Sequence, residues 1–164
     1  MVEICRQFGF LLDTGGLSVL LYRDDGNPRR ESFSQKLFYG IAYAYCRAND
    51  LDISPEADVG RGEVDFKFSH GARAKVVVEV KLASNQDLEH GFLVQVEEYA
   101  KAEQTEHRVY LVVRVDKAGA EARVDRFKAM VQEKQEAGTK LAVVMYADAR
   151  KKASASEYEP DDAA

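Results

Sequence analysis

The sequence predicts an α/β protein whose mixed central β-sheet is flanked by helices. The first observation is a pair of alternating, β-branched segments, 62–68 and 75–82, joined by a turn signal at His70-Gly71. The second is the order after residue 82, where helical and strand patterns alternate, so that crossover helices place some strands in parallel. The third is the length of 164 residues with 46% hydrophobic residues, which suits one domain with a sizeable core.

The predicted hairpin carries the charged residues on which the functional prediction depends. In the first strand Glu63 and Asp65 share one face, and in the second strand a glutamate and a lysine do so. A turn centred on Ala72 places Asp65 opposite Glu79 and, in the same register, Glu63 opposite Lys81. A slip of one residue would move the charged faces to opposite sides of the sheet. Because opposed like charges are destabilising, this arrangement needs a compensating cation, either a lysine or a metal ion.

A solvated surface on which acidic and basic residues merely mix is the alternative interpretation of this face. Segment 75–82 argues against it, because five of its eight residues are aliphatic and it is too apolar for an edge strand. A charged pair at the end of a buried strand is costly unless it has a partner or a role. The hairpin is therefore predicted to hold a functional site.

The first 26 residues are predicted to form a β-hairpin extension in front of the main domain. Two apolar pieces, 8–12 and 17–22, flank the turn signal Gly15-Gly16. The main domain is predicted to span residues 27–147. Residues 148–164 are small, charged and poor in apolar residues, which predicts a short, disordered, acidic tail.

The main domain is predicted to open with a helix that has Asn27 as N-cap, Pro28 at its first position and an end near residues 48–50. Its inward stripe is predicted to be Phe33, Leu37, Phe38, Ile41 and Tyr45. Glu31 and Gln35 lie four residues apart and share a face. For the isolated pair, an ordinary polar first turn is the favoured interpretation.

The remaining elements follow from periodicity and turn signals. They are a connector or short strand at 52–60, a helix at 87–103, a strand at 108–115, a helix at 121–135 and a strand at 140–146. Gln95 lies at the border of the apolar stripe of the second helix, and Tyr99 follows one turn later on the same side. A glutamine at such a border is usually unremarkable when taken alone.

Charge and composition limit the classes of function. The net charge of −5 argues against broad, sequence-independent binding to a phosphate backbone, although a cluster of metal-binding carboxylates would itself make the chain acidic. The basic residues are unevenly placed, with Arg23, Arg29, Arg30 and Lys36 around one helix start and Arg61 before the hairpin. The two cysteines lack metal-ligand spacing and are interpreted as reduced thiols of a cytoplasmic protein. No apolar run predicts a membrane span or a signal peptide.

Several familiar motifs are missing from the sequence, namely a glycine-rich phosphate loop, a Gly-x-Ser-x-Gly elbow and paired histidines of metal-ligand type. What remains is Asp65, Glu79 and Lys81, with Glu63, Glu31, Gln35, Gln95 and Tyr99 as candidates around them. Carboxylate oxygens suit Mg²⁺ or Mn²⁺, which can clamp a phosphodiester and activate water. A lysine beside the ion could orient or deprotonate that water, with a pKa depressed by burial and by the metal charge.

The segments Gly60-Arg61-Gly62-Glu63-Val64-Asp65-Phe66 and Val77-Val78-Glu79-Val80-Lys81 resemble the PD-(D/E)XK nuclease superfamily. The resemblance implies a restriction-endonuclease-like core, a mixed four-stranded sheet flanked by helices. It also implies that Asp65 and Glu79 are metal ligands, often joined by the Val80 carbonyl. Lys81 would then be the catalytic lysine, and Glu31 matches the glutamate that the preceding helix frequently turns toward the metal. The proline of the motif is replaced here by Val64.

The stretch Gln95-Val96-Glu97-Glu98-Tyr99 resembles the Gln-x-x-x-Tyr motif of the exonuclease-like branch. There the glutamine and tyrosine help to hold the substrate and order the site. The resemblance covers roughly residues 31–146, and it does not account for residues 1–25.

The resemblance implies a Mg²⁺- or Mn²⁺-dependent nuclease that hydrolyses phosphodiester bonds of DNA in a defence or repair setting. A nuclease that acts on RNA, or one that belongs to a system controlled by a nucleotide second messenger, is an open alternative. A non-catalytic module that keeps the nuclease fold and binds nucleic acid or a protein partner is the second reading. Strandedness, polarity and sequence preference stay open, and a homodimer or larger complex is an expectation from the family alone.

Overall fold

The computed structural model describes residues 1–58, 63–71 and 74–152, and for residues 56–58, 63 and 64 it describes the backbone alone. One five-stranded sheet in the order β1-β2-β3-β4-β5 forms the centre of this part of the chain. The strands are β1 Asp52–Asp58, β2 Glu63–His70, β3 Ala74–Leu82, β4 Arg108–Arg114 and β5 Val143–Asp148. The first three are antiparallel neighbours, whereas β3, β4 and β5 run parallel. The predicted class, a mixed sheet flanked by helices, is thus confirmed.

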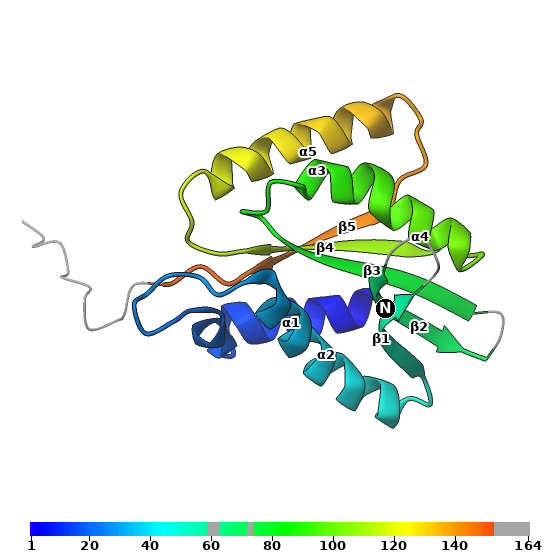
Figure 1. Ribbon diagram of the computed structural model, residues 1–164, viewed down its shortest axis with the longest axis horizontal. Helices are drawn as coiled ribbons and strands as arrows, with labels where there is room; N and C mark the ends of the chain where they lie inside the picture. Colours follow the sequence, from blue (N-terminus) through cyan, green and yellow to red (C-terminus); the bar gives the residue numbers. More distant parts are fainter. Residues whose placement is uncertain (59–62, 72–73, 153–164) are drawn as a thin grey trace, which may run out of the picture.

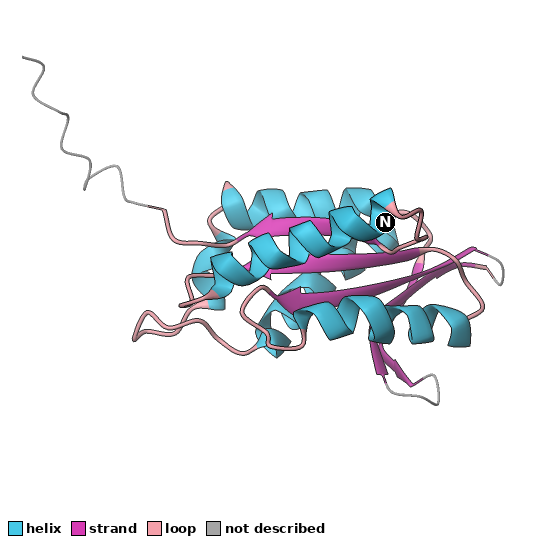
Figure 2. Cartoon of the chain, turned by 90° about the horizontal axis from the view of Figure 1, so that it is seen from above, coloured by secondary structure: helices cyan, strands magenta, loops and turns pink. Residues whose placement is uncertain are grey.

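Helices cover both faces of the sheet (Figures 1 and 2). One layer consists of α1 Val2–Asp13, the 3₁₀ turn η1 Leu17–Leu21 and α2 Glu31–Ala48. The other layer consists of α3 Leu88–His90, the π-helical turn η2 Gly91–Gln95, α4 Val96–Ala102 and α5 Ala120–Glu136. Burial follows strand alternation, because Val78 and Val80 face the first layer whereas Val77 faces the second. Of the helices in the described part, none combines the length and apolar character needed to span a membrane.

The hairpin formed by β2 and β3 has the register that the charge pattern predicts. Lys67 pairs with Val77 and Phe66 pairs with Val78, while the predicted centre of the turn, Ala72, lies outside the described residues. Extending that register by one residue sets Asp65 against Glu79. β3 is also a central strand, flanked by β2 and β4, which confirms that it is not an edge.

The predicted N-terminal β-hairpin is wrong. Residues 2–13 form helix α1, and residues 17–21 form a 3₁₀ turn. The buried residues Ile4, Cys5, Phe8 and Leu12 recur at helical spacing and pack into the core, with α1 lying against β5. A short apolar run does not distinguish a strand from a buried helix, and here tertiary packing selects the helix. The turn signal is correct, since Gly16 has a φ of 75°.

The start of α2 also differs from the prediction. Pro28 forms a β-bridge with Tyr22, and the backbone N–H of Arg29 donates to the Leu21 carbonyl at 2.8 Å. The Asn27 signal therefore belongs to a returning loop, and α2 begins at Glu31 after Arg30. The helix ends at Ala48, as predicted.

The inward face of α2 is made of smaller residues than predicted. Its buried positions are Ser34, Phe38, Ala42 and Cys46. The predicted stripe members Phe33 and Tyr45 are instead 42% and 37% exposed. The prediction assigned the large aromatic side chains to the inward face. In the structure, small side chains at i, i+4 spacing allow the helix to pack closely against the sheet.

The predicted tail begins too early. Asp148 ends β5, and Ala149 is buried, with its N–H donating to the Arg114 carbonyl at 2.9 Å. The rest of that prediction, from residue 153 onward, lies outside the described residues.

Candidate active site

Asp65 lies at the end of the β2–β3 ladder, whose last pair within the described residues is Phe66 with Val78. From there the carboxylate reaches β3, and its Oδ2 accepts a hydrogen bond from the Val80 N–H at 2.7 Å. Its Oδ1 accepts one from Gln35 Nε2 of α2 at 2.8 Å. The Asp65 side chain thus accepts the Val80 N–H in place of a backbone bond between the two strands. Because Gln35 bonds the same carboxylate, it is also part of the site.

Glu79 and Lys81 follow on β3, two residues apart and on one face. Glu79 is only 2% exposed, and its Oε1 lies 2.9 Å from Lys81 Nζ. Its Oε2 is buried and has no hydrogen-bond partner among the described residues. An unpaired buried carboxylate oxygen carries the desolvation penalty without compensation, so this atom has capacity for a further ligand.

Glu31, the first residue of α2, closes the cluster from the other side. Its Oε1 lies 3.5 Å from Lys81 Nζ. Its Oε2 accepts two hydrogen bonds of 2.8 Å, from the Leu82 N–H and from Asn85 Nδ2. These bonds tie the start of α2 to the carboxyl end of β3 and hold Glu31 beside the lysine.

Gln95 approaches the cluster from the other helical layer, across Gly91. A Cβ on Gly91 would lie 3.1 Å from Gln95 Oε1, 3.1 Å from Lys81 Cε and 2.6 Å from the Tyr110 hydroxyl. Only glycine fits there, because Tyr110 is held by its hydrogen bond to the Leu88 carbonyl at 2.7 Å. Gln95 Oε1 is the second buried oxygen without a partner in the described part of the chain. The π-helical turn that contains both Gly91 and Gln95 is a feature frequently found at functional sites.

Burial and mutual repulsion make the carboxylates hard to ionise. Burial, reinforced by the charge of Glu79, raises the pKa of Asp65 to about 8 despite its hydrogen bonds. Burial likewise raises the pKa of Glu79, although Lys81 opposes the rise. Strongly perturbed carboxyl pKa values cluster at functional sites, so this pair marks a candidate site.

The pKa of Lys81 does not follow the expectation of a depressed value. Burial alone would lower it, but Glu79, Glu31 and Asp65 together raise the pKa above its usual range. In the metal-free protein Lys81 is thus a hydrogen-bond donor and a counter-charge rather than a base.

The donor set suits a hard divalent cation. It consists of carboxylate oxygens, one of them buried and unpartnered on Glu79, with no sulfur or imidazole ligand. In the conformation described, no group of three or more His, Cys, Asp or Glu in the described residues is arranged to hold a metal. Lys81 Nζ lies within 2.9 Å of Glu79 and 3.5 Å of Glu31, so it would have to move for an ion to bind between these two carboxylates.

The remaining predicted site residues are Val80, Tyr99 and Glu63. Val80 is fully buried and uses its N–H to hold Asp65. Tyr99 is 7% exposed and lies in the core between the sheet and the second helical layer. The side chain of Glu63 lies outside the described residues. Sequence reasoning missed Asn85 and Gly91, although a lone glycine inside a helical pattern is a recognised signal of close packing.

Fold and site together define an α/β protein in which a mixed five-stranded sheet carries a buried carboxylate–lysine cluster at the end of one hairpin. Residues 1–117 match the family described as domain of unknown function DUF8371, and the chain therefore belongs to this family. The matched stretch contains α1 and the whole cluster. No curated protein and no solved structure matches the chain.

Proposed function

We propose that this protein is a Mg²⁺- or Mn²⁺-dependent nuclease that hydrolyses phosphodiester bonds of DNA in the cytoplasm. The observation that carries the proposal is the convergence of three carboxylates, Glu31, Asp65 and Glu79, around Lys81 in a buried site. The element order from α2 to β4 contains a mixed four-stranded sheet. This accords with a restriction-endonuclease-like core.

Asp65 and Glu79 are the residues that would hold the cation, with Glu31 and the Val80 carbonyl as further oxygen donors. A bound Mg²⁺ or Mn²⁺ would lower the pKa of a coordinated water and neutralise charge on the phosphodiester. Gln35 and the Val80 N–H fix the orientation of Asp65, and Asn85 fixes that of Glu31. Such support from a second layer of residues keeps ligands in position.

Lys81 has the role of a cationic donor at the reacting group. Its ammonium can donate three hydrogen bonds, so it can hold an attacking water or a phosphate oxygen once Glu79 is engaged elsewhere. Neutralising the carboxylate charge would also remove what now raises its pKa, which would bring Lys81 closer to use as a base. Gln95 offers an acceptor oxygen on the same side, where it could orient the water.

The test is cleavage of labelled single- and double-stranded DNA and matched RNA with Mg²⁺, Mn²⁺ or chelator. Lys81→Ala is compared with Lys75→Ala, which removes a part-buried, ion-paired lysine from the same strand. We expect metal-dependent cleavage of DNA that falls about 1,000-fold in Lys81→Ala and is retained in Lys75→Ala. A preference for RNA would change the substrate class, and equal loss in both variants would contradict a catalytic role of Lys81.

The competing proposal is a non-catalytic module that keeps the fold and binds nucleic acid or a protein. The ion-paired state of Lys81 and the lack of a ready-made metal cage among the described residues favour it. Complete inactivity on the panel, together with a melting temperature that Mg²⁺ and Mn²⁺ leave unchanged, would select this reading.

A further inference from the structure

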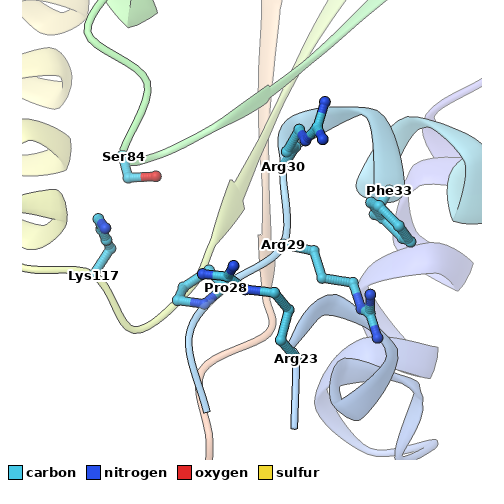
Figure 3. Close-up of a pocket in the computed structure, with 7 residues that line it drawn as sticks. All are labelled: Arg23, Pro28, Arg29, Arg30, Phe33, Ser84 and Lys117. Carbon is cyan, nitrogen blue, oxygen red and sulfur yellow. The ribbon is translucent and has the colours of Figure 1, made fainter. Parts of the chain in front are cut away.

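A basic pocket of about 430 Å³ lies between the loop before α2 and the loops after β3 and β4 (Figure 3). Its lining residues are Arg23, Pro28, Arg29, Arg30, Phe33, Ser84 and Lys117. Four of the seven are cationic and none is acidic, although the whole chain has a net charge of −5. The three arginines come from the loop that precedes α2, and Lys117 comes from the loop after β4.

The cations of this pocket are less neutralised than Arg108 and Arg150. Arg108 bonds Glu97, and Arg150 pairs with Asp148. By contrast, the side chains of Arg30 and Lys117 have no ion pair or hydrogen bond with any residue that the structure describes. Arg23 has only an exposed contact of 3.6 Å with Asp25. Like charges held together without counter-ions repel, and an anion in the pocket would relieve this.

The side chains have different positions in the pocket. Figure 3 shows Ser84 and Lys117 on one wall, and Arg30 on the other. Arg29 is turned away from them, since its Nε donates to the Tyr22 carbonyl at 2.9 Å and its guanidinium lies over the Phe33 ring, 4.8 Å from the centroid. Arg29 thus shapes the rim, whereas Arg30 and Lys117 are available to an anion.

The two walls are joined by the residues of the candidate active site. Arg30 directly precedes Glu31, and Ser84 lies between Leu82 and Asn85, the two residues that donate to the Glu31 carboxylate. The Ser84 wall is further fixed by Arg123 of α5, whose Nη1 donates to the Ser84 carbonyl at 2.8 Å. A group bound in the pocket would therefore lie next to the carboxylate–lysine cluster.

We propose that this pocket binds a phosphate group of the nucleic-acid strand whose neighbouring phosphodiester lies at the cluster. Guanidinium and ammonium groups are the usual protein donors to phosphate oxygens, and the exposed ring of Phe33 adds an apolar wall suited to a nucleotide. The identity of the strand rests on the proposed function, whereas the anion chemistry does not. The phosphate is either a terminal monoester or an internal diester. In the first case the pocket recognises the end of a strand, and in the second it contacts the backbone within the strand.

Binding is measured by fluorescence anisotropy with a labelled 12-nucleotide single-stranded DNA, in EDTA so that no cleavage occurs. The test variant is Arg30→Gln/Lys117→Gln, in which both side chains are exposed and the core is untouched. The control is Arg47→Gln/Arg126→Gln, which removes the same net charge at exposed positions on α2 and α5.

We expect the test variant to weaken binding at least tenfold relative to the control variant. The slope of log K against log salt should decrease by about 0.7, because the pocket neutralises one phosphate and each neutralised phosphate of a single strand contributes about 0.7. A dissociation constant within twofold of that of the control variant, with the same salt slope, would overturn the proposal.

Oligonucleotides with a 5′-phosphate, a 3′-phosphate or neither distinguish the two sources. Tighter binding of one phosphorylated form that is lost in the test variant assigns the pocket to a strand end. Equal binding of all three, weakened equally in the variant, assigns it to the internal backbone. Because binding is measured in EDTA and cleavage in Mg²⁺ or Mn²⁺, the two proposals can fail separately. Weaker binding by the test variant, together with no cleavage by the wild-type protein in either metal, would support the pocket and refute the nuclease. Unchanged binding by the test variant, together with Lys81-dependent cleavage, would refute the pocket and support the nuclease.

Discussion

The β2–β3 hairpin carries two clusters of charged side chains, and they differ in how well their charges are compensated. Toward the turn, Glu103 lies between Lys67 and Lys75, each 3.1 Å away. At the other end, Glu31, Asp65 and Glu79 share Lys81. Each cluster has members on both strands, but the side chains of Lys67 and Lys75 are 27% and 30% exposed, whereas those of Glu79 and Lys81 are 2% and 12% exposed. The two ends therefore differ in burial as well as in charge balance.

The pKa values report this difference. Burial alone would raise the pKa of Glu103, but its hydrogen bonds to Lys67 and Lys75 lower it below the usual value. At the other end burial prevails and the pKa of Asp65 is raised to about 8. The first cluster thus stabilises the fold with ionised groups. In the second cluster the ionised form of the carboxyls is disfavoured, and an added cation would stabilise that form. Proteins accept such locally unfavourable arrangements mainly at functional sites.

The largest expected effect comes from removing the compensated glutamate. Glu103→Gln should lower the free energy of unfolding by about 3 kcal/mol, because two part-buried lysines lose their shared partner. Glu79→Gln should change it by less than about 1 kcal/mol or raise it, since it removes a charge that burial disfavours. Urea denaturation in EDTA at pH 7 measures both. Equal losses would mean that the Glu79 cluster is structural and would remove the contrast.

The second prediction concerns metal-induced stabilisation. At a hundredfold excess over its dissociation constant, Mn²⁺ or Mg²⁺ should stabilise the wild-type protein by about 2.7 kcal/mol. Asp65→Asn should abolish this increment, whereas Glu103→Gln should retain it on a lower baseline. Thermal unfolding with and without metal gives the comparison. An increment that survives in Asp65→Asn would place metal binding elsewhere in the chain.

The hairpin and its central residues could be predicted from the sequence because strand alternation has a period of two and one register alone aligns the charges. The prediction therefore placed Asp65 against Glu79 across the strands, which agrees with the observed register. Alternation also identified β3 as buried. The helix α5 and strand β4 were predicted within a residue of their observed bounds for the same reason, namely a clear period.

The remaining features depend on tertiary contacts that no local pattern specifies. Whether residues 2–13 form a helix or a strand was decided by packing of α1 against β5, more than 130 residues away. Gln35 looks like any polar residue in a first helical turn until its bond to Asp65 is known. Lys117 joins the arginines of the basic pocket only because the loop after β4 returns to the start of α2.

The third prediction tests the close approach at the π-helical turn. Gly91→Ala should destabilise the protein by about 2 kcal/mol through overpacking, because the new Cβ would lie 2.6 Å from the Tyr110 hydroxyl. It should also reduce cleavage more than tenfold, since Lys81 and Gln95 border the same space. The control is Gly40→Ala in α2, where no atom lies within 4 Å of the added Cβ and helix propensity favours alanine. Similar stability of the two variants would contradict the tight packing.

The smallest expected effect is a pH dependence of opposite sign at the two clusters. In the folded, metal-free protein Asp65 has a raised pKa, so its contribution is fully present below the unfolded value near 4 and is lost as the pH rises through about 8. Glu103 has a lowered pKa, so its contribution is present above its unfolded value and is lost as the pH falls through the lower folded value.

Between pH 5 and pH 8 the free energy of unfolding in EDTA should therefore fall, because the unfolded chain releases the Asp65 proton in this range whereas the folded protein retains it. Asp65→Asn should flatten this decline, and Glu103→Gln should leave it in place while reducing the loss of stability in acid. Urea titrations at half-unit pH intervals provide the curves. A decline that persists unchanged in Asp65→Asn would show that Asp65 ionises at its ordinary pKa, and the two ends of the hairpin would then be electrostatically alike.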